Sequence, residues 1–218
     1  MGFYSIVAFF QKGGLFMYPI MLVFAVGMAS VFERWVQLSR VQSANHKMWN
    51  LLQPVLVKGD FDKARQMINK DKSSMAQMLG MGLARQGAVR RREDIEIAME
   101  ESMMEIIPQL EKRTPYVALL SNIATLLGLL GTIMGLIAAF TAVANANPAE
   151  KADLLSASIS VAMNTTAFGL MSAIPLLLFH AKLTSTTGQI VDSLEMASVK
   201  ALNTISNFTK RQFDRNES

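Results

Sequence analysis

Cysteine is absent from the 218-residue chain, and its two histidines are His46 and His180. Without cysteine there can be no disulfide framework, thiol nucleophile or cysteine metal site. We interpret the two isolated histidines as boundary or surface residues, so no metal or cofactor is predicted. A phosphate loop and a paired catalytic constellation of Ser and His or of two Asp are also missing. The sequence therefore does not predict an enzyme.

Charge is missing from three long stretches. No Asp, Glu, Lys, Arg or His occurs in 13–32, 116–149 or 154–179. Each stretch supplies the roughly 20 residues that a helix needs to cross a hydrocarbon core about 30 Å thick. The sequence therefore predicts an all-α integral membrane protein with three transmembrane helices in a lipid bilayer.

The basic residues are confined to two parts of the chain. All but two of the 21 lysines and arginines lie in 34–113 or 182–215, the exceptions being Lys12 and Lys151. This distribution follows the positive-inside rule and predicts a periplasmic N-terminus and a cytoplasmic C-terminus. Acidic residues roughly balance the basic ones in 34–113, so a nucleic-acid groove is not predicted. The expected segments are a periplasmic or interfacial start (1–14), transmembrane helices (15–38, 114–144 and 154–181), a cytoplasmic helical domain (39–113), a periplasmic loop (145–153) and a cytoplasmic C-terminal helix (182–218).

The first residues do not have the positive start and cleavage site of a signal peptide. Residues 3–10 instead favour a short interfacial helix. The pair Gly13 and Gly14 is then expected to turn the chain into the membrane.

Prolines and a turn motif divide the cytoplasmic segment. We expect two short helices broken at Pro54 and again at 58–60, with Asp60 capping the second. Pro108 and Pro115 flank the entry to the second spanning helix, where they favour a kink in one long helix over its end.

Two cytoplasmic faces show helical periodicity. One amphipathic face comprises Ile95, Met99, Met103, Ile106 and Leu110. The other continues the third spanning helix and comprises Leu183, Ile190, Leu194, Ala197, Ala201 and Phe208. Both predict helix packing. The glutamates beside the first face could also form a cation site, but no histidine accompanies them.

The second spanning segment combines small and polar residues. Its small-residue face comprises Gly128, Gly131 and Gly135, which include a G-x-x-x-G pair typical of helix–helix contact in lipid. Beside it runs a polar stripe of Asn122, Thr125 and Thr132. At about 100° per residue, Thr132 lies at the edge of the small-residue face.

The third spanning segment places three polar residues in a row, and they point in different directions. Thr166 shares a face with Ala162, Gly169 and Ala173. Thr165 shares a hydroxyl stripe with Ser158 and Ser172, and Asn164 lies over Ser160. Pro175 is expected to bend this helix.

Two interpretations of these hydroxyls remain open. A threonine in a membrane helix often bonds its own i−4 carbonyl and has no further role. Alternatively, the two stripes line a shared polar cleft. The stretches 116–149 and 154–179 contain no Asp, Glu, Lys, Arg or His, so a proton pathway here would need a carboxylate from another chain.

The motifs "LLGLLGTIMGLIAAF" and "SISVAMNTTAFGLMSAIPLLLFHAKL" resemble those of the MotA/TolQ/ExbB proton-channel family. The three-helix layout is similar to the ExbB and TolQ branch. In this resemblance, Thr132 and Thr166 match channel-facing threonines and Pro175 matches a helix-bending proline. Val161 departs from the pattern, because relatives usually carry Glu there, and Thr165 replaces the usual Ala.

The resemblance implies a pentamer in the bacterial inner membrane. It would surround transmembrane helices of an ExbD-, TolR- or MotB-like partner that carries a membrane Asp. Ion flow, of H⁺ or, given the extra hydroxyl of Thr165, of Na⁺, would then drive work in the periplasm or at the outer membrane. The competing hypothesis is a structural membrane scaffold that conducts no ions.

Overall fold

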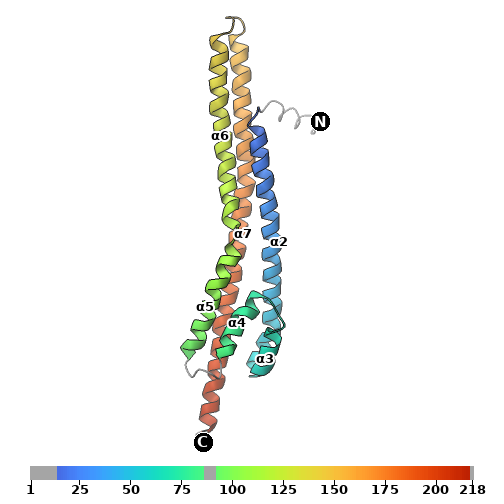
Figure 1. The fold of residues 1–218 in the computed structure, drawn as a ribbon, viewed down its shortest axis with the longest axis vertical. Helices are drawn as coiled ribbons and strands as arrows, with labels where there is room; N and C mark the ends of the chain where they lie inside the picture. The colour runs from blue at the N-terminus through green and yellow to red at the C-terminus, as the bar shows by residue number, and fades with distance from the viewer. Residues whose placement is uncertain (1–13, 86–91, 217–218) are drawn as a thin grey trace. The chain divides into compact units, whose positions relative to one another are not determined.

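The computed structural model describes residues 14–85 and 92–216, with side chains as far as Phe208. These residues form helices joined by short turns (Figure 1). The helices are α2 (Met17–Val57), α3 (Phe61–Ile68), α4 (Ser74–Arg85), α5 (Arg92–Glu111), α6 (Thr114–Ala144) and α7 (Lys151–Asn216). The interfacial helix predicted for 3–10 lies outside the described residues. Gly14, in the turn before α2, has a φ of 74°. Glycine adopts this left-handed conformation without the steric strain that a side chain would cause.

The chain divides into two compact units. The first unit comprises Met1–Arg34 and Arg113–Leu183, and the second comprises Trp35–Lys112 and Thr184–Ser218. Helices α2 and α7 contribute residues to both units. Each unit has its own buried side chains and is described separately below.

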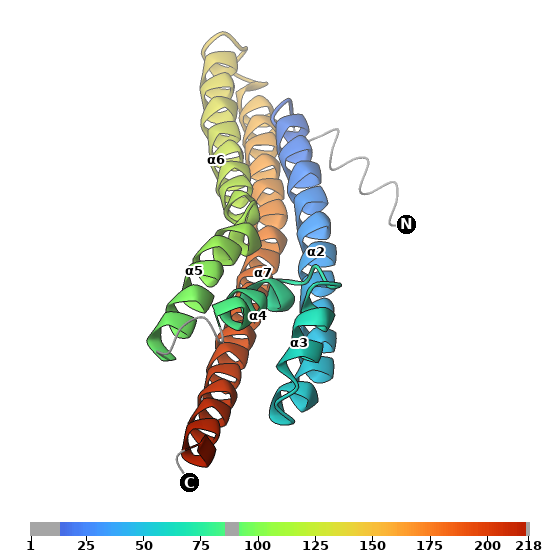
Figure 2. The ribbon, with the colours of Figure 1, turned by 60° about the horizontal axis from the view of Figure 1, so that its bottom comes forward.

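In the first unit, α6 and α7 run side by side and the start of α2 packs against them (Figures 1 and 2). Ile20, Ala124 and Ala173, one from each helix, form a buried apolar cluster. Gly27 of α2 lies so close to α7 that an added methyl group would come 2.7 Å from a methyl carbon of Leu176. Small residues therefore set the distance between the helices of this unit.

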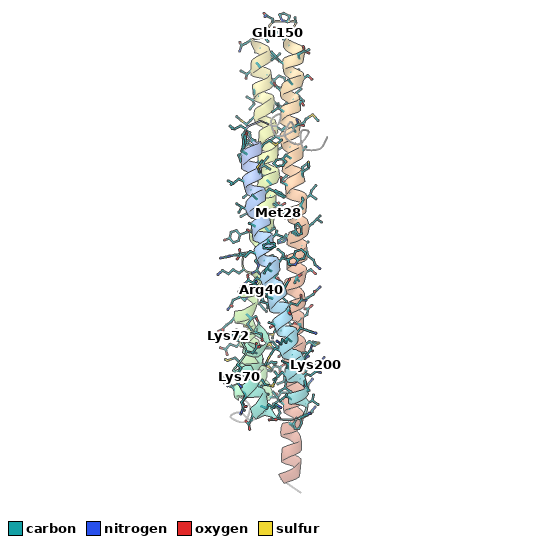
Figure 3. All side chains as sticks on the ribbon, turned by 90° about the vertical axis from the view of Figure 1, so that its right-hand side faces the viewer. Met28, Arg40, Lys70, Lys72, Glu150 and Lys200 are labelled. Carbon is teal, nitrogen blue, oxygen red and sulfur yellow. The ribbon has the colours of Figure 1, made fainter. Side chains whose placement is uncertain are left out.

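A short connection joins α6 to α7. Helix α6 ends at Ala144 and α7 begins at Lys151. Glu150 lies in this turn, as Figure 3 shows. The two helices are therefore antiparallel neighbours, and their contact can extend along much of their length.

Helix α2 is longer than the sequence predicted. The expected break at Pro54 is wrong, because α2 continues through Pro54 to Val57. Leu52 and Leu56, on either side of the proline, are fully buried, and their packing supports the helix despite the missing backbone donor. The break at 58–60 is confirmed, and Gly59 adopts a φ of 76° there.

The single kinked helix expected around Pro108 and Pro115 is also wrong. Helix α5 contains Pro108 and ends at Glu111, while α6 begins at Thr114 with Pro115 in its first turn. Between them, Arg113 has a left-handed φ of 68°. A reversal of φ interrupts the helical hydrogen bonds more completely than a proline kink does.

The second unit packs α3, α4 and α5 with the later parts of α2 and α7. The predicted cap is confirmed, since Asp60 accepts a hydrogen bond from the backbone N–H of Lys63 at 3.1 Å. On the first predicted amphipathic face only Met103 is partly exposed. On the second face, Ile190, Leu194, Ala197 and Ala201 are buried and Phe208 is partly exposed, while Leu183 is buried in the first unit. Both faces form helix contacts, as their spacing predicted.

Candidate functional site

Helices α6 and α7 come into backbone contact where glycine meets glycine. A methyl group added at Gly169 would lie 2.8 Å from the carbonyl oxygen of Ala124 and 2.9 Å from Cα of Gly128. These are backbone atoms, which cannot move aside as a flexible side chain can. Any larger residue at Gly169 would therefore separate the two helices.

Two threonine hydroxyls meet beside this glycine contact. Oγ1 of Thr132 on α6 and Oγ1 of Thr166 on α7 form a hydrogen bond with each other. Thr166 Oγ1 also lies 3.0 Å from the carbonyl oxygen of Gly128 across the interface. Thr132 Oγ1 lies 3.3 Å from the carbonyl oxygens of both Gly128 and Ala162. We refer to Thr132 and Thr166 as the hydroxyl pair.

The hydroxyl pair has more acceptors than protons. Each hydroxyl carries one proton and two lone pairs. The acceptors within reach are two carbonyl oxygens and the partner hydroxyl. Both threonines are partly exposed within the protomer. Each hydroxyl can therefore rotate between acceptors, and the pair remains within reach of a group at the edge of the interface.

Thr165 is placed differently from its neighbour. Its side chain is 2% exposed, and its methyl group packs against Gly131. Its hydroxyl donates to the i−4 carbonyl oxygen of Val161 at 3.0 Å. This is the local bond that a threonine in a membrane helix often makes. Gly135, one turn after Gly131, lies against Ala162, so each glycine of the small-residue face meets α7.

No hydrogen bond described in the structure joins the remaining predicted polar residues to the hydroxyl pair. Asn122 and Thr125 are exposed within the protomer, and Thr125 donates to the carbonyl oxygen of Ser121 at 3.2 Å. Asn164 and Ser158 are partly exposed. Pro175 lies inside α7, which continues through it.

Ser121 was not among the predicted site residues, although it joins the two helices. It is fully buried, and its hydroxyl donates to the carbonyl oxygen of Ala173 at 2.8 Å. A signal was present in the sequence, because Ser121 precedes Gly128 by seven residues and so extends the small-residue face. Serine is small enough to belong to this face and polar enough to bond across it.

A second polar contact joins α2 to the start of α6 in the first unit. Arg34 of α2 is 1% exposed, and its Nε donates to Oγ1 of Thr114 at 3.3 Å. Beside it, the exposed side chains of Glu33 and Arg113 form an ion pair. Glu33 and Arg34 directly follow the charge-free stretch 13–32. Their partners, 80 residues away in the sequence, were not predicted.

The hydroxyl pair contains no titratable group of its own. The spanning stretches of α6 and α7 are free of Asp, Glu, Lys, Arg and His. Val161 occupies the position at which the resemblance would place Glu. It lies near the start of α2, since a methyl group added at Gly14 would come 3.1 Å from its side chain. Among the described residues, no group of three His, Cys, Asp or Glu is arranged to hold a metal ion. The site therefore offers hydroxyls and carbonyls alone.

The fold and the site define the class of protein. Three helical segments, α2, α5–α6 and α7, are long and apolar enough to cross a membrane. Their contacts use glycine, alanine and internally bonded hydroxyls, as expected where lipid replaces water. The chain is a multi-pass α-helical membrane protein.

Residues 70–196 match the MotA/TolQ/ExbB proton channel family, and the chain belongs to this family. It is 28% identical over 189 residues to a Synechocystis protein named as ExbB-like 1, a biopolymer transport protein, covering 84% of this chain and 72% of that one. It is 24% identical over 196 residues to an ExbB homologue of Methanothermobacter thermautotrophicus, covering 89% and 68%. Over 86 residues it is 34% identical to the Tol-Pal system protein TolQ of Haemophilus influenzae, covering 39% of this chain and 37% of TolQ.

Proposed function

We propose that this protein is the ion-conducting subunit of a membrane motor that converts ion motive force into mechanical work. The hydroxyl pair carries the proposal. Thr132 and Thr166 can each exchange one acceptor for another by rotation about a single side-chain bond. Such hydroxyls can orient a nearby carboxylate or pass a proton through water without a large rearrangement of the helices.

The titratable group must then come from a second protein. The spanning stretches of α6 and α7 supply no carboxylate. We infer a partner of the ExbD, TolR or MotB type, with one transmembrane helix and an Asp that meets the hydroxyl pair. Protomers of this chain would surround the partner as a pentamer in the bacterial inner membrane, with the N-terminus in the periplasm and the C-terminus in the cytoplasm. Rotation of one component relative to the other would deliver work to the periplasm or outer membrane.

The other predicted residues receive supporting roles. Gly128, Gly131, Gly135 and Gly169 hold α6 and α7 close enough for the pair to form. Thr165, next to Thr166, packs its methyl group against Gly131 of α6. Its hydroxyl could join the pathway only after its hydrogen bond to the Val161 carbonyl breaks. Asn122 and Thr125, exposed within the protomer, would extend the polar surface toward the partner.

We assign H⁺ as the transported ion. The hydroxyl pair can relay a proton, and the family is described as a proton channel family. Na⁺ would instead require several oxygen ligands around one position. The buried hydroxyl of Thr165, one residue from Thr166, would be a candidate for one of them.

A structural scaffold is the second candidate function. It is favoured by the bonds from the hydroxyl pair to backbone carbonyls, since these also serve as interhelical hydrogen bonds. In a scaffold the hydroxyls would matter for assembly alone.

Substitution of each threonine by valine separates the two functions, because valine keeps the shape and removes the hydroxyl. As a conductor, Thr132→Val or Thr166→Val assembles normally with a co-purified single-span, Asp-bearing partner but loses the powered function. Full activity in both variants would refute ion conduction through this pair. Loss of assembly in parallel with loss of activity would favour the scaffold.

A further inference from the structure

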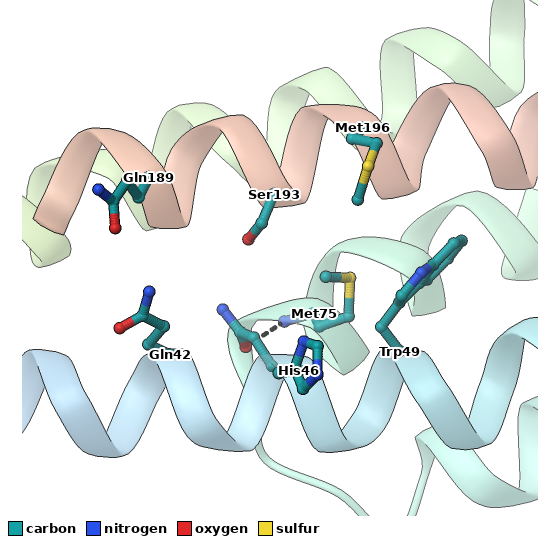
Figure 4. A pocket seen from close by; sticks show the side chains of 8 residues that line it. Gln42, His46, Trp49, Met75, Gln189, Ser193 and Met196 are labelled. Carbon is teal, nitrogen blue, oxygen red and sulfur yellow. Dashed lines mark hydrogen bonds between the residues drawn. The ribbon is translucent and has the colours of Figure 1, made fainter.

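A cavity of about 120 Å³ lies in the second unit. Figure 4 shows Gln42, His46 and Trp49 approaching it from α2, and Gln189, Ser193 and Met196 from α7. Met75, at the start of α4, completes the wall. A single water molecule needs only about 10–15 Å³ of such space. The cavity therefore has room for a small molecule.

Asn45 gives the cavity a fixed hydrogen-bond donor. This residue is 2% exposed and lines the cavity. Its Oδ1 accepts a hydrogen bond from the backbone N–H of Met75 at 3.0 Å, which fixes the orientation of the amide. Its Nδ2 is buried and has no hydrogen-bond partner. A buried donor without a partner is costly, so an acceptor placed beside Nδ2 would be stabilised.

Ser193 gives the cavity an acceptor. Its hydroxyl donates its one proton to the carbonyl oxygen of Ile190 at 2.7 Å. The lone pairs of Oγ then remain to accept a hydrogen bond. The side chains of Gln42 and Gln189, which are exposed, can each supply a donor or an acceptor at the mouth.

The charge and the apolar surface of the walls restrict the chemical class of the ligand further. None of the described residues that line the cavity is Asp or Glu, so an ammonium group would lack a compensating charge. Trp49, Met75 and Met196 provide apolar surface beside the polar groups. We propose that this cavity binds a small uncharged carboxamide, whose carbonyl accepts from Asn45 Nδ2 and whose NH₂ donates to Ser193 Oγ.

Trp49 provides a direct reporter of binding. The chain has two tryptophans, so Trp35→Phe leaves Trp49 as the only one. We expect propionamide to change the Trp49 emission of the full-length protein saturably. Propionate has nearly the same shape, but it carries a charge and has no donor. It should bind at least tenfold more weakly, as expected for the loss of one buried hydrogen bond.

Two variants test the assigned contacts. Asn45→Asp keeps the acceptor for the Met75 N–H but replaces the donor, and it should weaken propionamide binding about tenfold or more. Asn50→Asp makes the same change at an exposed position of α2 and should leave binding unchanged. If the Asn45→Asp substitution prevents folding, Ser193→Ala decides, because alanine removes the hydroxyl that would accept from the ligand, together with its local bond to the Ile190 carbonyl. A response that does not saturate would show that the cavity binds no carboxamide. Equal binding by Ser193→Ala and the parent protein would show that Ser193 Oγ does not contact the ligand. Either result would overturn the proposal.

Discussion

The hydroxyl of Thr166 donates to the carbonyl oxygen of Gly128 across the contact of α6 and α7, at 3.0 Å. This bond can form because Gly128 and Gly169 have no side chains, so the backbones of α6 and α7 come close enough for the Thr166 side chain to reach a carbonyl of α6. The packing and the chemistry of the site therefore depend on the same few residues. Separate substitutions can test the packing, the buried bonds and the hydroxyl chemistry.

The glycine contact predicts a strong position dependence within one helix. Gly169→Ala should destabilise the protein by about 1–3 kcal/mol, because the added methyl group meets the backbone of Ala124 and Gly128. Gly188→Ala is the matched control, since an added methyl group there has no atom within 4 Å. It should stabilise α7 by up to about 1 kcal/mol through helix propensity. Thermal unfolding in detergent measures both, and equal effects would contradict the close contact.

The buried bond of Ser121 predicts a loss of stability with little loss of side-chain volume. Ser121→Ala should cost about 1 kcal/mol, since it removes the hydrogen bond to the Ala173 carbonyl in a site that water does not reach. Ser156→Ala changes an exposed serine of α7 and should shift stability by less than about 0.5 kcal/mol. The midpoints of denaturant unfolding give the comparison. A neutral Ser121→Ala would mean that the bond contributes nothing to the contact of α6 and α7.

The left-handed backbone of Arg113 predicts that glycine is the better residue between α5 and α6. Arg113→Gly and Arg113→Ala both remove the exposed ion pair with Glu33, which is worth less than about 1 kcal/mol. Only glycine relieves the strain at a φ of 68°. Arg113→Gly should therefore be about 1 kcal/mol more stable than Arg113→Ala. Equal stability of the two variants would indicate a continuous helix through residues 112–114.

Much of the fold could be predicted from the sequence because its signals are local. The absence of charge marked three apolar segments, and the spacing of Ile95 to Leu110 marked a buried face. The cap at Asp60 needed only its own turn. The small residues of the two spanning helices also followed from spacing, and the structure brings Gly128 and Gly169 together.

The features that could not be predicted depend on residues far apart in the chain. Pro54 was expected to end a helix, but tertiary packing of Leu52 and Leu56 outweighs its local effect. The bond between Arg34 and Thr114 joins residues 80 positions apart, so neither local sequence reveals it. Helical spacing predicts the faces of α7 on which Thr165 and Thr166 lie. It does not predict which carbonyl each hydroxyl bonds, because that depends on how α6 packs against α7. The roles of these residues in conduction stay predictions.

Proton flux through the assembled complex tests the proposed conduction most directly. The measurement compares Thr166→Val with Thr166→Ser in vesicles that contain this chain and its co-purified partner. Serine keeps the hydroxyl and should retain most of the flux. Valine keeps the volume and should lower it about tenfold or more, the loss expected when a hydroxyl no longer bonds a charged group. Equal flux in the valine and serine variants, with both complexes intact, would contradict a pathway through the hydroxyl pair.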